Sequence, residues 1–135
     1  MGYKEALEAA GAKVHAFEEF GSYQGDWWAK VTYQDNTGWI RGSYGSCSGC
    51  DAFEAEFGWR DRGRCEEHEW DSDEERKNCE ACEVKKKEFD IRFSKFGAEY
   101  LDGIKTQENA EAVASENLDW DCDAEKMVKF IKDNA

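Results

Sequence analysis

Four residues between positions 65 and 82 have the types and the spacing of a zinc site. Cys65 and His68 are separated by two residues, and Cys79 and Cys82 are separated in the same way. A pair at this spacing can bind one ion through both side chains, and two pairs supply the four thiolate or imidazole ligands of tetrahedral zinc. The sequence therefore predicts zinc as the cofactor, with Cys65, His68, Cys79 and Cys82 as its ligands.

A further Cys-x2-Cys pair lies upstream, at Cys47 and Cys50, and competes for the same role. A site made of Cys47, Cys50, Cys79 and Cys82 is the main alternative to the first prediction. The sequence leaves open which pairs share an ion and whether one or two ions bind. Cys122 is interpreted as an ordinary small buried residue, because free cysteine is among the most buried residue types.

The number of protein ligands decides whether such a site is structural or catalytic. Four ligands leave no position for an activated water, so the site is predicted to be structural and the protein non-enzymatic. If one of the four does not bind, water could take its place. Glu66, Glu67 or Glu69 could then serve as the base of a small zinc-dependent hydrolase.

The negative charge of the chain concentrates around the cysteines. The net charge is −13, and residues 47–82 contribute 12 acids against 5 bases. This sign opposes direct binding of nucleic acid and fits a basic protein partner, although the same acidity could serve only to keep a small protein soluble. The carboxylates expected to contact such a partner are Glu66, Glu67, Glu69, Asp71, Asp73, Glu74 and Glu75.

The segments before the cysteines predict a small sheet. A chain of 135 residues fits a single domain, 1–135, and residues 3–10 have helical spacing of apolar side chains. Residues 26–34 and 38–44 alternate as strands around a turn predicted at 35–38, and with the segment that begins at Val14 they form an antiparallel meander. The following segment, 51–59, fits a helix or a strand equally well.

The segments after the cysteines predict helices. One apolar stripe at steps of three and four comprises Phe89, Phe93, Phe96, Tyr100 and Ile104. The helix that carries this stripe is expected to start at or before Cys82. Thr106 and Asp121 are the predicted N-caps of two shorter helices that follow it. The expected fold is α+β. It has an N-terminal helix and meander (1–46), a zinc-bound acidic segment (47–82) and a helical tail (83–135) that covers one face of the sheet.

The location expected from the sequence is the cytoplasm. Residues 1–12 lack the cationic start and the apolar stretch of a signal peptide, and no apolar run approaches the length of a membrane helix. Cysteine pairs in a reducing compartment hold metals more often than they form disulfides. This expectation agrees with the predicted zinc site.

Residues 25–44 resemble the central part of an SH3-type barrel, through GDWWAKV, a turn, GWI and a final SY. The resemblance implies a partial barrel and a proline-binding groove lined by Trp27 and Tyr44. A structural adaptor is a related hypothesis. In it, Trp27, Trp28, Trp39 and Tyr44 would form an exposed aromatic patch that contacts a partner.

Three longer segments show a wider resemblance: GSYQGDW, GSYGSCSGCDAFEAEFG and ENLDWDCDAEKMVKFIK. Together with the Cys-x2-His and Cys-x2-Cys pairs, they resemble small bacteriophage-encoded proteins of unassigned activity, over residues 14–132. The resemblance implies the cytoplasm of a bacterial host as the setting. It also implies stoichiometric binding to a host nucleic-acid-handling protein, with inhibition of that protein as one outcome.

Overall fold

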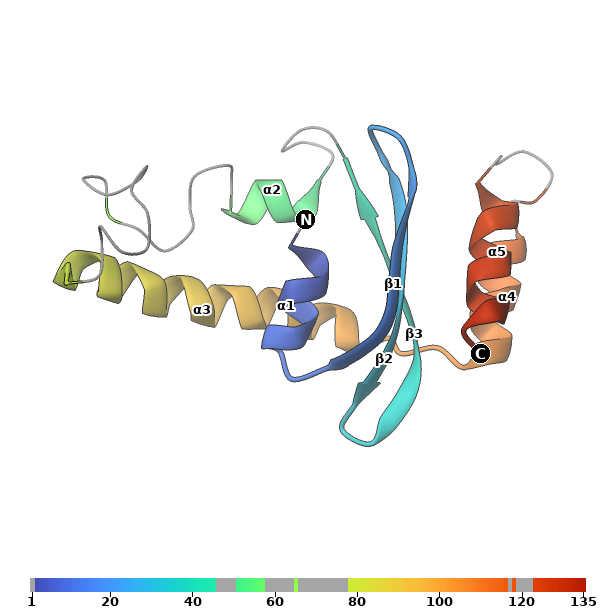
Figure 1. The fold of residues 1–135 in the computed structure, drawn as a ribbon, viewed down its shortest axis with the longest axis horizontal. Helices are drawn as coiled ribbons and strands as arrows, with labels where there is room; N and C mark the ends of the chain where they lie inside the picture. The colour runs from blue at the N-terminus through green and yellow to red at the C-terminus, as the bar shows by residue number, and fades with distance from the viewer. Residues whose placement is uncertain (1, 46–50, 58–64, 66–77, 117, 119–122) are drawn as a thin grey trace.

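The computed structural model describes residues 2–45, 51–57, 65, 78–116, 118 and 123–135 (Figure 1). One helix, three consecutive strands and four further helices follow one another along these residues, and the sheet occupies the centre of the molecule. In chain order the elements are α1 (Tyr3–Ala9), β1 (Lys13–Gly21), β2 (Gly25–Tyr33), β3 (Asn36–Tyr44), α2 (Ala52–Phe57), α3 (Glu80–Leu101), α4 (Gln107–Ser115) and α5 (Ala124–Asp133).

The three strands form an antiparallel meander in the order β1-β2-β3. The predicted α+β fold with a small meander is therefore confirmed. The register runs without interruption from Gly25↔Tyr44 to Tyr33↔Asn36 between β2 and β3. Between β1 and β2 it shifts once, at a bulge between Val14 and Ala16.

The turn between β2 and β3 spans residues 33–36, two residues earlier than the predicted turn at 35–38. Gln34 and Asp35 have φ values of 49° and 67°, the positive values that a two-residue hairpin turn requires. Gly38 belongs to β3 instead, where a Cβ atom would lie 2.4 Å from the carbonyl oxygen of Lys105. Gly38 is needed because the backbone at Lys105, in the segment after α3, lies too close to β3 for a side chain to fit. This contact is between distant parts of the chain, so local sequence patterns do not predict it.

Helices cover both faces of the sheet, which corrects the prediction of a single covered face. Trp27 and Trp28 are neighbours in β2, so their side chains point to opposite faces. Trp27 joins the core with α1, α2 and α3, while Trp28 joins the core with α4 and α5. Figure 1 shows the two groups of helices on either side of the strands. The fold therefore has three layers.

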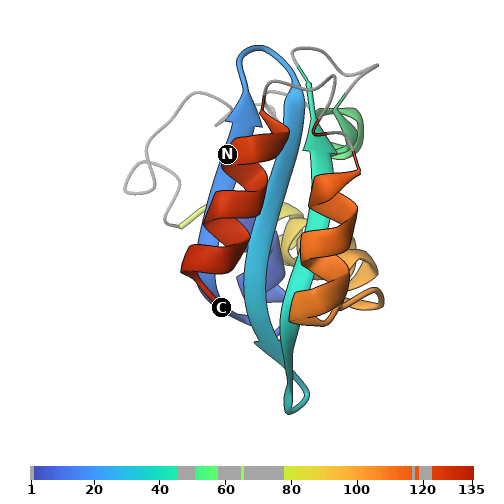
Figure 2. The same cartoon turned by 90° about the vertical axis from the view of Figure 1, so that its right-hand side faces the viewer.

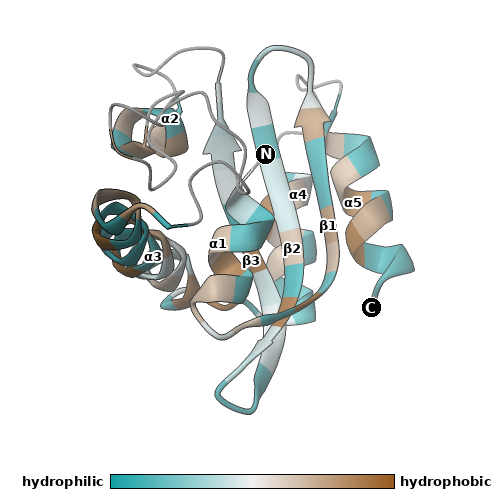
Figure 3. Ribbon diagram, turned by 60° about the vertical axis from the view of Figure 1, so that its left-hand side comes forward, coloured by the Kyte–Doolittle hydropathy of each residue, from teal (hydrophilic) through white to brown (hydrophobic). Residues whose placement is uncertain are grey.

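The first face packs against a helix whose aromatic stripe was predicted. Helix α3 begins at Glu80, before Cys82 as expected, and its phenylalanines contact the core residues Phe53 and Phe57. Phe53 and Phe57 lie in α2, so the ambiguous segment forms a helix over Ala52–Phe57, while residues 58 and 59 lie outside the described residues. Figure 3 shows apolar and polar residues on different sides of α3.

The second face packs against two shorter helices, which lie side by side in Figure 2. The predicted N-cap of α4 is confirmed, because Thr106 Oγ1 accepts a hydrogen bond of 3.1 Å from the backbone N–H of Asn109. Helix α5 begins at Ala124 and its N-cap is Asp123, so the predicted cap at Asp121 is wrong. Asp121 itself lies outside the described residues. None of the helices in the described part is both long and apolar enough to cross a membrane.

Candidate metal centre

The start of α3 positions two of the cysteines. Cys79 is the N-cap residue, with extended backbone angles of φ −87° and ψ 113°, and Cys82 lies in the first turn. The backbone N–H of Glu83 donates to the carbonyl of Cys79 at 3.1 Å, which closes that turn. Glu80 and Glu83 place negative charge where the helix dipole favours it. The two-residue spacing therefore becomes a pair of thiols at a helix N-terminus.

Cys65 completes a cluster of three thiols. Its Sγ atom lies 3.8 Å from that of Cys79 and 3.4 Å from that of Cys82, and all three sulfurs lie within 4.8 Å of one another. These separations are too long for a disulfide, whose S–S bond is about 2.05 Å. They are close to the edge of a tetrahedron with metal–sulfur bonds of about 2.3 Å, which is about 3.8 Å. The three sulfurs can therefore hold a metal ion.

The thiols differ in how readily they ionise. The pKa of Cys79 is lowered, chiefly because the backbone N–H of Cys82 faces its sulfur; partial burial opposes this, and the thiols of Cys82 and Cys65 add to it. The pKa of Cys82 is raised, first by burial and then by its neighbours in the cluster, although a backbone N–H at Cys65 opposes the rise. Metals bind the thiolate. Of these two thiols, Cys79 is therefore the one that ionises more readily to the thiolate that a metal binds.

Three of the four predicted ligands are thus brought together, from two parts of the chain. The fourth, His68, lies outside the described residues. The same is true of the alternative pair, Cys47 and Cys50, and of Cys122. The structure places Cys65 beside Cys79 and Cys82, as the first of the two predicted ligand sets requires.

The cysteine cluster joins the two ends of the most acidic part of the chain. Residues 66–78 contain seven acids and two bases, and Cys65 and Cys79 flank them. The Sγ atoms of these two cysteines are 3.8 Å apart, so the two residues that flank the acidic segment lie close together. The predicted partner-binding carboxylates, Glu66, Glu67, Glu69, Asp71, Asp73, Glu74 and Glu75, all lie outside the described residues.

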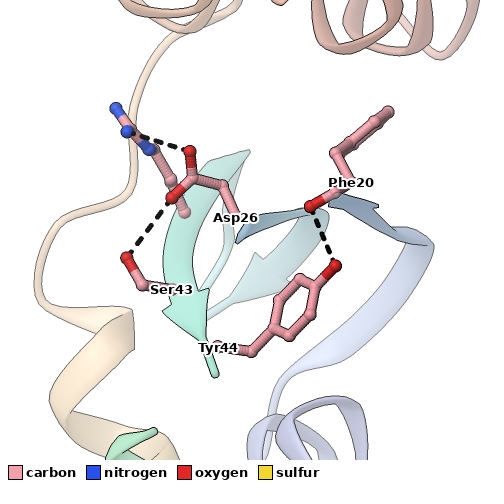
Figure 4. Close-up of polar contacts among 5 residues, drawn as sticks. Phe20, Asp26, Ser43 and Tyr44 are labelled. Carbon is pink, nitrogen blue, oxygen red and sulfur yellow. Dashed lines mark hydrogen bonds and ion pairs between the residues drawn. The ribbon is translucent and has the colours of Figure 1, made fainter. Parts of the chain in front are cut away.

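The prediction of an exposed aromatic patch is wrong. Trp27 and Trp28 have 0% of their surface exposed, Trp39 has 1% and Tyr44 has 6%. Helices on both faces bury them, which neither the adaptor hypothesis nor the barrel resemblance anticipated. The hydroxyl of Tyr44 donates to the carbonyl of Phe20 at 2.9 Å (Figure 4). Trp27 and Tyr44 are therefore core residues in this fold.

A small polar cluster lies on the surface at the same end of the sheet. Asp26 accepts hydrogen bonds from Arg41 and from Ser43, each at 3.3 Å (Figure 4). These residues come from β2 and β3, and their register pairs Asp26 with Ser43. Since Arg41 and Asp26 are both partly exposed, this pair has little effect on stability.

Asp51 is a buried structural residue that connects three elements of the fold. It is 3% exposed and accepts hydrogen bonds from the Tyr3 hydroxyl at 2.5 Å, from the Gly45 N–H at 3.0 Å and from the Phe53 N–H at 2.9 Å. One carboxylate thus connects α1, the end of β3 and the start of α2. The sequence signal was an aspartate directly before a short helix, where N-capping is common.

No protein-family model, curated protein or solved structure matches this chain. The relation to bacteriophage proteins therefore stays a prediction.

Proposed function

We propose that this protein is a non-enzymatic zinc-binding protein that acts by stoichiometric binding to a basic protein partner. The observation that supports it best is the cluster of Cys65, Cys79 and Cys82, with sulfurs 3.4–3.8 Å apart at the base of an acidic loop. The metal would hold the ends of that loop together. The loop would then present its carboxylates to the partner.

Zinc is the metal that suits this donor set best. Soft thiolates favour zinc over the hard cations magnesium and calcium, which prefer oxygen ligands. The free thiols and their tetrahedral spacing agree with a structural zinc site. Cys65, Cys79 and Cys82 would hold the ion with a fourth donor, for which His68 is the predicted residue and Cys47 or Cys50 the alternative.

A structural role fits the composition of the loop. Residues 66–78 contain one large apolar side chain, Trp70, so burial offers little free energy to order them. Zinc can replace a hydrophobic core in such a segment, since its binding to structural sites contributes about 10–16 kcal/mol of apparent free energy. A bound zinc ion would crosslink Cys65 to Cys79 and Cys82, whose thiolates would be its ligands.

The partner is inferred from charge and setting. A loop with seven acids and two bases attracts a basic surface, such as the surface with which a protein binds nucleic acid. Competition with nucleic acid for that surface would inhibit the partner. The bacteriophage resemblance makes a nucleic-acid-handling protein of a bacterial host the proposed target, in the host cytoplasm.

The metal is tested first. Elemental analysis of purified protein should give one zinc per chain, lost in Cys65→Ser and retained in the matched variant Cys122→Ser. Analysis of Cys47→Ser then decides between the two ligand sets, because it retains zinc only if Cys65 and His68 bind. A wild-type protein that is metal-free, folded and unaffected by a strong chelator would contradict the proposal.

The absence of catalysis is tested by counting ligands. X-ray absorption spectroscopy of the zinc-bound protein should show four sulfur or imidazole donors and no bound water. A spectrum with three protein donors and one water would instead favour the small zinc hydrolase.

Binding to the partner should weaken as salt rises, because screening weakens attraction between exposed charges. Salt-independent binding would contradict the charge-based mechanism.

A further inference from the structure

One edge of the sheet is open in the part of the chain that the structure describes. The outer strands are β1 and β3. The outer edge of β3 is partly covered, because Trp39 and Lys105 exchange backbone hydrogen bonds of 2.8 and 2.7 Å. No backbone hydrogen bond from another described residue reaches the outer edge of β1. Its N–H and C=O groups can therefore accept an added strand.

A groove lies between this edge and α5. It has a volume of about 450 Å³, and its walls include Glu18, Glu19 and Phe20 of β1 and Phe130 of α5. Phe20 and Phe130 meet edge to face, with ring centroids 5.8 Å apart. Figure 2 shows α5 running along the sheet close to β1. An edge strand beside a helix can bind a peptide by strand addition, with backbone bonds to the strand and side-chain contacts to the helix.

The usable length of the edge is the second half of β1. The bulge between Val14 and Ala16 interrupts the strand near its start, and bulges discourage pairing. From Ala16 to Gly21 the pairing with β2 is regular. Those residues are also the ones that lie beside the groove.

The charges in the groove favour a basic occupant. Its two lysines are already paired on their own helix, since Lys126 lies 3.7 Å from Asp123 and Lys129 lies 2.7 Å from Asp133. Glu18 and Glu19 make no ion pair with any described residue. Glu18 pairs with Trp28 across the strands, so its carboxylate lies on the α5 face beside the aromatic rings, whereas Glu19 pairs with Trp27 and lies on the opposite face of the same edge. The groove therefore presents one carboxylate that has no ion-pair partner among the described residues. Lysine or arginine side chains can pair with such a carboxylate and lay their apolar stems along the rings.

We propose that this groove binds an extended basic segment of the partner protein, added to β1 as a fourth strand. The proposal rests on the proposed function only in taking the partner to be basic, because the groove shares no residue with the cysteine cluster. A second copy of this chain fits less well. Antiparallel pairing of two β1 strands would bring Glu18 and Glu19 of one copy close to those of the other, and like charges opposite each other are destabilising.

The test uses a labelled peptide of alternating lysine and valine, KVKVKVK, titrated into the full-length protein at low salt. The variant Glu18→Lys/Glu19→Lys should bind at least about tenfold more weakly. The matched variant Glu88→Lys/Asp90→Lys makes the same charge change at exposed positions on α3 and should stay within about twofold of wild type. Equal weakening by both variants would overturn the proposal, because it would show attraction to net charge alone.

Strand addition is tested separately from charge. The same peptide with N-methylated backbone amides keeps its charge but cannot donate to β1, so it should bind at least about tenfold more weakly. Equal binding of the two peptides would overturn strand addition. A dimer of this chain that the peptide disrupts would overturn the choice of occupant, because it would show that a second copy binds this edge. Failure of the groove is distinguishable from failure of the metal centre. A protein that contains zinc but ignores the peptide refutes only the groove, and a metal-free protein that binds the peptide refutes only the zinc.

Discussion

Helices α1, α2 and α3 cover one face of the sheet with a large cluster of aromatic rings, whereas on the other face a smaller aromatic cluster is combined with side-chain hydrogen bonds that join α4 and α5 to the sheet. On the first face the ring of Trp27 lies 5.3 Å from Tyr3, 5.4 Å from Phe17 and 5.1 Å from Tyr100. On the second, Gln107 accepts from Trp39 Nε1 at 2.7 Å and donates to the carbonyl of Ile131 at 3.0 Å. One amide therefore links β3, α4 and α5.

The difference shows two ways to fix a helix on a sheet. Close packing of rings specifies a position by shape, because a close-packed interior has few voids and tolerates little change in volume. Hydrogen bonds specify a position by direction, because a buried donor without a partner is costly. The first face should therefore be sensitive to volume and the second to polarity.

The largest expected effect is that of Trp27→Ala, which tests the first face by removing volume. Trp27 is fully buried among three aromatic neighbours, and loss of a buried tryptophan costs about 3–5 kcal/mol. Urea unfolding of the zinc-loaded protein measures the change. Tyr23→Ala is the matched control, because Tyr23 is 82% exposed and should change stability by less than about 0.5 kcal/mol. Equal effects would contradict the burial of Trp27.

The same face should also reject added volume. A Cβ atom on Gly97 would lie 2.0 Å from the carbonyl oxygen of Ala6, where α3 crosses α1. Gly97→Ala should therefore destabilise by about 1–3 kcal/mol, although alanine in a helix normally gains about 1 kcal/mol over glycine. Gly103→Ala is the control, because nothing lies within 4 Å of its Cβ position. Thermal unfolding that ranks Gly97→Ala as the more stable variant would show that the helices are not in contact there.

Much of this fold was predictable because its elements have strong local patterns. The alternation in β2 specifies which residues share a face of the sheet, and the stripe on α3 specifies the side that packs against the core; the structure confirms the meander and the start of α3. The division of helices between two faces was not predictable. Alternation places Trp27 and Trp28 on opposite faces, but only tertiary packing decides that both faces are covered.

The candidate site was predictable to a similar degree. Spacing alone pairs Cys79 with Cys82, because two intervening residues bring both thiols to one turn of chain. The contact of Cys65 with Cys79 and Cys82 joins residues 14 and 17 positions apart in the sequence, so spacing within one turn cannot establish it. The structure places the Cys65 Sγ atom 3.8 Å from that of Cys79 and 3.4 Å from that of Cys82. The exposure of Trp27 and Tyr44 was predicted wrongly, because an aromatic residue in an alternating strand looks the same whether or not a helix covers it.

A polar substitution tests the second face. Gln107→Leu keeps a similar volume but leaves Trp39 Nε1 and the Ile131 carbonyl without their partner. Loss of two partly buried hydrogen bonds should cost about 1–3 kcal/mol and raise amide hydrogen exchange in α4 and α5 before α1 and α3. Gln24→Leu is the control, at an exposed position in the β1–β2 loop. Faster exchange in α1 and α3 instead would contradict the independence of the two faces.

The smallest expected effect appears only in alkaline solution and distinguishes Tyr3 from exposed tyrosines. Burial, and then the hydrogen bond to Asp51, raise the pKa of Tyr3 above its ordinary value near 10. Above pH 10 the unfolded chain loses this proton while the folded protein keeps it, so stability should fall as pH rises, by at most about 1.4 kcal/mol per pH unit for this group. Tyr3→Phe should make the fall less steep in urea unfolding between pH 9 and pH 11, and Tyr23→Phe should not. An unchanged slope in Tyr3→Phe would mean that Tyr3 is not held in its protonated form by the first face.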